Sequence, residues 1–100
     1  MTDSTSTALI TGGTSGIGFA TAKKLAQLDI HVLVVGRNAE RGKKAIDEIR
    51  AARGKADFIS SELRGADSAR EVARKAIELG NGHVDILINN AGIYPFGAYA

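Results

Sequence analysis

A glycine-rich stretch near the N-terminus, LITGGTSGIG at residues 9–18, has the residue types and spacing of a phosphate-binding turn. Glycines let the backbone come close to a ligand, so that its N–H groups and the positive end of a following helix can hold an anion. Threonine and serine hydroxyls in the same turn can add donors. The residues expected to contact the phosphates are Gly12, Thr14, Ser15, Gly16, Ile17 and Gly18.

The spacing in this stretch is Thr-Gly-x-x-x-Gly-x-Gly from Thr11, which departs from the general dinucleotide fingerprint G-x-G-x-x-G. Read from Gly16 and Gly18, the third position of that fingerprint falls on Thr21. Taken alone, the stretch is also compatible with a tight strand-to-helix turn that binds nothing. A second polar group, Asn-Asn-Ala-Gly at 89–92, follows an apolar run and is a further candidate for ligand contact.

Alternating strand and helix patterns surround both groups. Short apolar runs predict strands at residues 8–10, 30–35, 56–60 and 84–88. Apolar residues at helical spacing predict amphipathic helices over 17–28, over 39–53, and from 67 or 68 to Gly80. The side chains expected to line the buried stripes of these helices are Ile17, Ala22, Leu25, Ala26, Leu28, Ala45, Ile46, Ile49, Ala52, Ala69, Val72, Ala73, Ala76 and Ile77.

Cap signals mark the ends of two of these helices. Asn38 can cap the second helix, which is expected to end at Gly54. Ser68, with Glu71 three residues later, forms a capping-box pattern at the start of the third helix.

The order β-α-β-α-β-α-β predicts an α/β fold with a Rossmann-like, doubly wound parallel sheet, because successive parallel strands need right-handed helical crossovers. If the second and third strands extend to one side of the first and the fourth lies on the other, the strand order is 3-2-1-4. Ligands bind such sheets at the carboxyl ends of the strands where the order reverses. Here those ends are residues 11–18 and 89–92, and residues 1–6 are expected to form a disordered tail.

Composition excludes several other classes of protein. A chain of 100 residues with 44% apolar and 24% charged residues is an ordinary soluble globular domain. A net charge of +2 is too balanced for a nucleic-acid or membrane surface, and the absence of cysteine excludes disulfides and thiol chemistry. No secretion signal or membrane-length apolar run is present, which favours a cytoplasmic location. Neither His31 nor His83 is expected to be a ligand or a base, and no metal site is expected.

The two motifs together, at 11–18 and 89–92, resemble the short-chain dehydrogenase/reductase family, and the likeness extends over essentially the whole chain from Thr7. The Gly36-Arg37 pair and the strand before Asn89 match as well. The resemblance implies that residues 7–100 are the N-terminal part of a dinucleotide-binding domain. It also implies an oxidoreductase that reduces a carbonyl or oxidises an alcohol of a small-molecule substrate, and a full-length protein that is a homo-oligomer.

The resemblance further implies roles for individual positions. The segment from Gly12 to Gly18 would hold the cofactor pyrophosphate. The adenosine ribose would be lined, and the central sheet supported, by Asn89, Asn90, Ala91 and Gly92. Glu62 and Leu63 would contact the adenine, although the family usually has Asp at the first of these positions.

Cofactor choice in the family is set after the second strand. An acidic residue there would bind the ribose hydroxyls of NAD, but this chain has Gly36 followed by Arg37. Because an arginine fork can hold a 2′-phosphate, NADP is predicted over NAD. The alternative is that Arg37 is a solvated surface arginine.

The family's catalytic Tyr-x-x-x-Lys pair is not found in these residues. Tyr94 has Ala98 four places on, and no lysine follows Lys75. No catalytic residue is therefore assigned, and the chain is expected to be an N-terminal fragment that is inactive by itself. Two alternatives to the enzyme interpretation are a nucleotide-binding module without catalysis and a structural or engineered half-domain.

Overall fold

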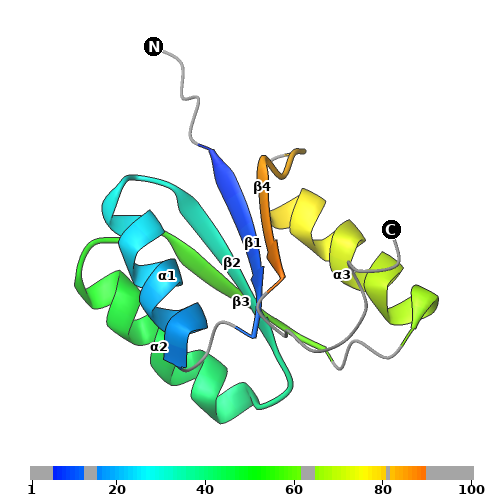
Figure 1. The fold of residues 1–100 in the computed structure, drawn as a ribbon, viewed down its shortest axis with the longest axis horizontal. Coiled ribbons are helices and arrows are strands. Elements are labelled where there is room, and N and C mark those ends of the chain that lie inside the picture. The colour runs from blue at the N-terminus through cyan, green and yellow to red at the C-terminus, as the bar shows by residue number, and fades with distance from the viewer. Residues whose placement is uncertain (1–5, 13–15, 62–64, 81, 90–100) are drawn as a thin grey trace.

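The computed structural model describes residues 6–12, 16–61, 65–80 and 82–89, and strands alternate with helices along them (Figure 1). The strands are β1 (Thr7–Thr11), β2 (His31–Gly36), β3 (Ala56–Ser60) and β4 (Ile86–Asn89). The helices are α1 (Gly16–Gln27), α2 (Ala39–Ala51) and α3 (Ala66–Leu79). Except for Ser6, the expected tail lies outside the described residues.

The four strands form one parallel sheet in the order β3-β2-β1-β4, which confirms the predicted topology. Thr7 pairs with His31 of β2, and Ala8 pairs with Ile86 of β4. All five residues of β1 are buried. This follows from its central place, since β1 has a neighbouring strand at each edge and apolar residues above and below.

Helices cover both faces of the sheet (Figure 1): α1 and α2 lie on one face and α3 lies on the other. Side chains alternate between the two faces because the period of a strand is two residues. One cluster of buried residues comprises Ala8, Ile10, Ala22, Ala26, Val32, Val34, Ile46, Ile49 and Ala56. The other cluster, under α3, comprises Leu9, Leu33, Val35, Ile59, Val72 and Ala76.

The helix α3 buries a narrower stripe than the sequence predicted. Only Val72 and Ala76 are buried, whereas Ala73 is exposed and the exposed fraction of Ile77 is 48%. The helix α3 packs mainly against β2 and β3, so only the side chains that face these two strands are covered. Two apolar residues expected to face inward from α1 and its C-terminal end, Ile17 and Leu28, are also exposed, by 78% and 60%.

The predicted capping box at the start of α3 is wrong. The N-cap residue is Gly65, which makes no side-chain cap hydrogen bond, and the helix begins at Ala66. Ser68 lies inside the first turn, where its hydroxyl donates to the Gly65 carbonyl at 3.2 Å. Glu71 accepts instead from Arg74 at 2.7 Å. A serine in the first turn of a helix can donate its hydroxyl to a backbone carbonyl of that turn. A capping-box pattern in the sequence can therefore lie a few residues after the true N-cap.

The ends of α2 show one prediction confirmed and one displaced. The Asn38 side chain accepts from the Arg41 N–H at 3.0 Å, as an N-cap does. At the other end the left-handed residue is Arg53, with φ 69°, and not Gly54. Gly54 is required for space, since a Cβ there would lie 2.7 Å from Ile49 Cγ2.

Candidate functional site

All four parallel strands end at the same edge of the sheet, called here the carboxyl edge. Thr11 at the end of β1 pairs with Asn89 at the end of β4, so the two sequence motifs are brought together although they are far apart along the chain. The strand order reverses between these two strands, because the chain passes from β1 outward to β3 and returns to β4. In doubly wound sheets this is the position where nucleotides bind.

In the part of the glycine turn that the structure describes, two backbone positions are left-handed, Gly12 and Gly16. Gly12 has φ 66° and donates its N–H to the Val35 carbonyl at 2.9 Å, which extends the pairing of β1 with β2 by one residue. Gly16, the first residue of α1, has φ 61°. A Cβ at Gly16 would meet no atom within 4 Å, so this glycine is needed for backbone conformation and it opens on free space.

The N-terminus of α1 therefore lies at the carboxyl edge, beside the end of β1. Gly18 is buried within α1, whereas the neighbouring Ile17 side chain is exposed. The first amide groups of a helix have no acceptor within the helix, and the helix dipole makes this end positive. The arrangement can hold an anion. Thr14 and Ser15, which the sequence assigned to the same turn, lie outside the described residues.

Arg37 follows directly after β2 at the carboxyl edge. It is exposed, and it has no ion-pair partner among the residues that the structure describes. It lies one residue before the cap of α2, so the ordered turn fixes where its backbone lies. The end of β3 is also near, because Ser61 donates its N–H to the Gly36 carbonyl at 2.9 Å. An arginine placed in this way is available to an anionic ligand.

The remaining predicted contacts follow the ends of β3 and β4. Glu62 and Leu63 come directly after Ser61, and Asn90, Ala91 and Gly92 come after Asn89. These five residues lie outside the described part of the chain. The structure therefore places the strand ends that lead into these segments, and the contacts themselves stay predictions.

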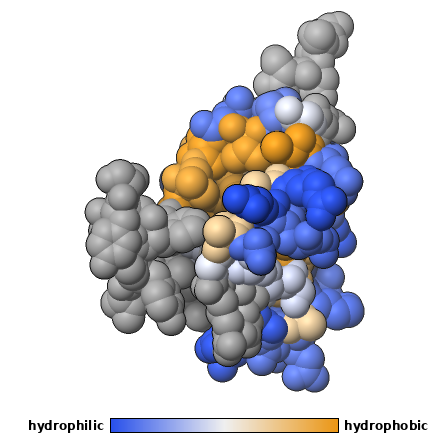
Figure 2. Space-filling view, turned by 90° about the vertical axis from the view of Figure 1, so that its right-hand side faces the viewer, coloured by the Kyte–Doolittle hydropathy of each residue, from blue (hydrophilic) through white to orange (hydrophobic). Residues whose placement is uncertain are grey.

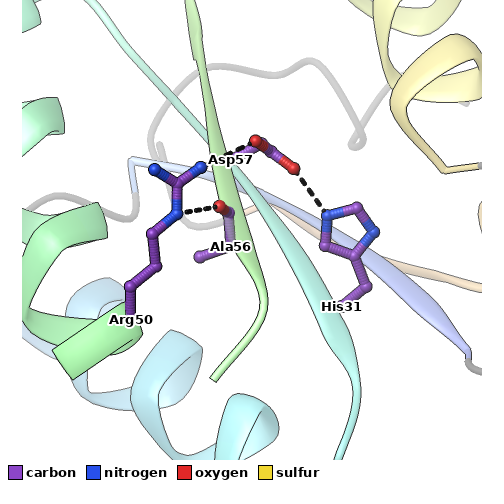
Figure 3. A network of polar contacts seen from close by, with 4 residues as sticks. All are labelled: His31, Arg50, Ala56 and Asp57. Atoms are coloured by element: carbon purple, nitrogen blue, oxygen red, sulfur yellow. Dashed lines mark hydrogen bonds and ion pairs between the residues drawn. The ribbon is translucent and has the colours of Figure 1, made fainter. Parts of the chain in front are cut away.

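A polar network that the sequence did not reveal lies at the opposite edge, where the strands begin, called here the amino edge (Figure 3). Asp57 of β3 lies between His31 Nε2, at 2.8 Å from Oδ2, and the Arg50 guanidinium, whose Nη2 lies 2.9 Å from Oδ1. Arg50 also donates from Nε to the carbonyl of Ala56 at 3.0 Å. His31 thus has a structural partner at the amino edge, far from the candidate site.

Within the described ranges no three His, Cys, Asp or Glu residues are grouped so as to hold a metal ion. The described helices are also all too short or too polar to span a bilayer.

Similar sequences carry names of oxidoreductases. Human polyprenol dehydrogenase is 36% identical over 88 residues, which are 86% of this chain and 26% of the human protein. A probable 2,4-dienoyl-CoA reductase of Bacillus subtilis is 40% identical over 83 residues, 83% of this chain and 32% of the bacterial protein. The chain thus spans about a quarter to a third of the length of these relatives.

Solved structures show the same fold. Actinorhodin polyketide ketoreductase with NADPH superposes with a TM-score of 0.85 at 34% identity, over 92% of this chain and 35% of that protein. A metagenomic short-chain oxidoreductase in complex with NADP gives a TM-score of 0.82 at 34% identity, over 88% of this chain and 39% of that protein. The family model for short chain dehydrogenases matches residues 6–100. By this match, and with its Rossmann-like sheet, the chain belongs to the short-chain dehydrogenase/reductase family of oxidoreductases.

Proposed function

We propose that this chain binds NADP(H) at the carboxyl edge and forms the cofactor-binding part of an oxidoreductase that reduces a carbonyl or oxidises an alcohol. The observation that supports this most is the pairing of Thr11 with Asn89, which brings the two motifs to the point where the strand order reverses. The free space at Gly16 and the N-terminus of α1 suit a pyrophosphate.

The proposed contacts divide the cofactor among three strand ends. The turn from Gly12 to Gly18, with Thr14 and Ser15, would bind the pyrophosphate. The segment 89–92 would line the adenosine ribose, and Glu62 with Leu63 would meet the adenine. Bound in this way, the cofactor would supply or accept the hydride.

Arg37 is the basis for proposing NADP over NAD. Its exposed guanidinium has no described ion-pair partner and follows β2, where a 2′-phosphate would come. A carboxylate in this place would repel that phosphate, but the chain has Gly36 and Arg37. Two solved structures of the same fold contain NADPH or NADP, which is consistent with this choice.

Titration of the chain with NADPH and with NADH tests the proposal. We expect tighter binding of NADPH, and we expect Arg37→Ala to weaken NADPH binding by about tenfold to a hundredfold, since a charge-assisted hydrogen bond contributes about 1.5–3 kcal/mol. NADH binding should change little. Lys55→Ala is the matched control, because Lys55 is exposed and precedes β3 at the amino edge. Equal affinity of the unmodified chain for both cofactors would refute the preference.

The chemical step is proposed to need residues that these 100 do not contain. Neither Tyr94 nor Tyr99 has a lysine four places on. The chain alone is therefore expected to bind NADPH without oxidising it in the presence of a carbonyl compound. Steady loss of NADPH absorbance with purified chain would contradict this. For the whole protein we propose a small-molecule substrate with an alcohol or carbonyl group, and a homo-oligomeric state.

A further inference from the structure

The strand β4 is short and its apolar pattern leaves its register open. It comprises four residues, of which Ile86, Leu87 and Ile88 are all apolar. Ile86 and Ile88 pack against the buried cluster under α1 and α2, whereas Leu87 points to the other face and is 60% exposed. A slip of one residue along β1 would exchange the faces and still bury an apolar side chain. Hydrophobic patterning alone therefore specifies this pairing weakly.

Figure 2 shows the side of the molecule that lies to the right in Figure 1, and an apolar area on it borders polar residues. The exposed Leu87 belongs to β4. In the described part of the chain the sheet ends at β4, since only β1 pairs with it. Contacts with β1 must therefore determine most of the register of β4.

Asp85, the residue just before β4, makes two hydrogen bonds to one residue of β1. Its backbone N–H donates to the Thr7 carbonyl at 2.8 Å, and its carboxylate Oδ2 accepts from the Thr7 N–H at 2.8 Å. In a longer parallel strand, the carbonyl of residue 83 would accept that second bond. The carboxylate of Asp85 thus takes the place of a backbone acceptor at the amino end of β4.

Burial makes this contact important. Thr7 is only 2% exposed, and its N–H points toward β4, so loss of the acceptor would leave this part-buried donor without a partner in the protein. The same Oδ2 lies 3.2 Å from His83 Nε2, which further restrains the carboxylate. In any slipped register the Asp85 carboxylate would no longer lie opposite Thr7, so this hydrogen bond favours the native register. Without the carboxylate, the native register would lose that advantage over slipped registers.

We propose that Asp85 is a positioning residue for the nucleotide site. By its two bonds to Thr7 it selects the register in which Thr11 pairs with Asn89, and so it holds Asn89, where the segment 89–92 begins, beside the end of β1. The effect on ligand binding rests on the proposed function. A slip of one residue would move Asn89 by about 3.3 Å along the strand, and the start of the segment 89–92 with it.

The test uses Asp85→Ala and the rescue variant Asp85→Asn, whose amide oxygen can still accept from Thr7. The first readout is the pattern of backbone NMR contacts between β1 and β4, above all between Leu9 and Leu87. We expect this pattern to be shifted or lost in Asp85→Ala and kept in Asp85→Asn. An unchanged pattern in Asp85→Ala would overturn the proposal.

The second readout is the Kd for NADPH, measured well below the melting temperature of each variant. We expect Asp85→Ala to bind about tenfold more weakly, equivalent to about 1.4 kcal/mol, and Asp85→Asn to bind nearly as well as the unmodified chain. Asp57→Ala is the control, because it removes another structural aspartate, at the amino edge of β3, without touching β4. If Asp57→Ala weakens NADPH binding as much as Asp85→Ala, general destabilisation explains both and the proposal fails.

A second variant keeps the proposal testable if Asp85→Ala does not fold. Asp85→Ser also removes the carboxylate, and an unchanged pattern of contacts between β1 and β4 in Asp85→Ser would overturn the proposal. If the unmodified chain binds neither NADPH nor NADH, the proposed function fails. The contacts between β1 and β4 then still decide whether Asp85 sets the register.

Discussion

Substitution of Gly42 should show how closely α2 is packed on the sheet. Gly42 is a buried residue in the first part of α2, and a Cβ there would lie 2.4 Å from the Cε1 and Cζ atoms of Phe58 and 2.6 Å from its Cδ1. Phe58 is half-buried and packs against the cluster under α1 and α2, so its ring has little freedom to move away. We therefore expect Gly42→Ala to force a shift of the ring or of the helix.

Two opposing terms set the size of the effect. Overpacking of a core contact costs about 1–3 kcal/mol, and an overlap of this depth belongs near the upper end. Alanine in place of glycine in a helix gains about 1 kcal/mol. The net expectation is that Gly42→Ala lowers the free energy of unfolding by about 1–2 kcal/mol.

A second background separates the two terms. Phe58→Val removes all three ring atoms that would meet the new methyl group and keeps a residue that suits a strand. In that background we expect Gly42→Ala to raise the free energy of unfolding by about 1 kcal/mol, so that the sign of the effect reverses. The coupling energy of the double-mutant cycle would then be about 2–3 kcal/mol.

Equilibrium unfolding in urea, followed by circular dichroism, measures all four proteins. The m-value should stay constant, which would show that the denatured state is unchanged. Stabilisation by Gly42→Ala in the unmodified background would refute the reasoning, because it would mean that the Phe58 ring moves aside without cost. The same conclusion would follow if the effect were equal in both backgrounds.

Three further substitutions test local features by the same unfolding assay. Asn38→Ala should destabilise by about 1 kcal/mol through loss of the cap on the Arg41 N–H, and Asn38→Asp, which can still cap, should not. Arg53→Gly should stabilise by about 0.5–1 kcal/mol, because φ 69° is costly for a residue with a Cβ; a loss of stability would show that the Arg53 side chain contributes more than its strain. Gly80→Ala should destabilise by at least about 2 kcal/mol, since its Cβ would lie 2.5 Å from a backbone carbonyl oxygen and 2.9 Å from Thr7, and neutrality would contradict this.

The topology was predictable because local signals and long-range packing agree. Strand β3 spans the predicted residues, α1 follows the predicted glycine turn, and α2 follows the predicted Asn38 cap. The order β3-β2-β1-β4 then follows from the handedness of the crossovers together with the placement of the two motifs. The helix ends were less predictable. At the end of α2, Gly54 is the better local candidate for a left-handed residue. In the structure Gly54 instead lies close to Ile49 and Ala26, where there is no space for a Cβ, and Arg53 adopts the left-handed conformation.

The polar contacts of the amino edge were not predictable from pattern alone. The contact between His31 and Asp57 depends on the register of β2 with β3, in which Leu33 pairs with Asp57. A shift of one residue would place the carboxylate on the other face of the sheet. A histidine at the start of one strand and an aspartate in the next do not by themselves predict a contact. The contact can be predicted only when the register of the two strands is known. The bond from Thr7 to Asp85 has the same origin.

Residues at the amino edge of the sheet contribute mainly to stability and residues at the carboxyl edge mainly to ligand binding, with Asp85 as the exception. At the amino edge, Asp57 and Asp85 hold neighbouring strands together through short hydrogen bonds and ion pairs. At the carboxyl edge, the described residues offer a helix N-terminus, open space at Gly16 and the exposed Arg37. A change at the amino edge should therefore alter stability and leave ligand affinity intact wherever the strand is long enough to keep its register. β4 has four residues and pairs only with β1 in the described sheet, so Asp85 is the amino-edge residue whose loss should reach the binding site.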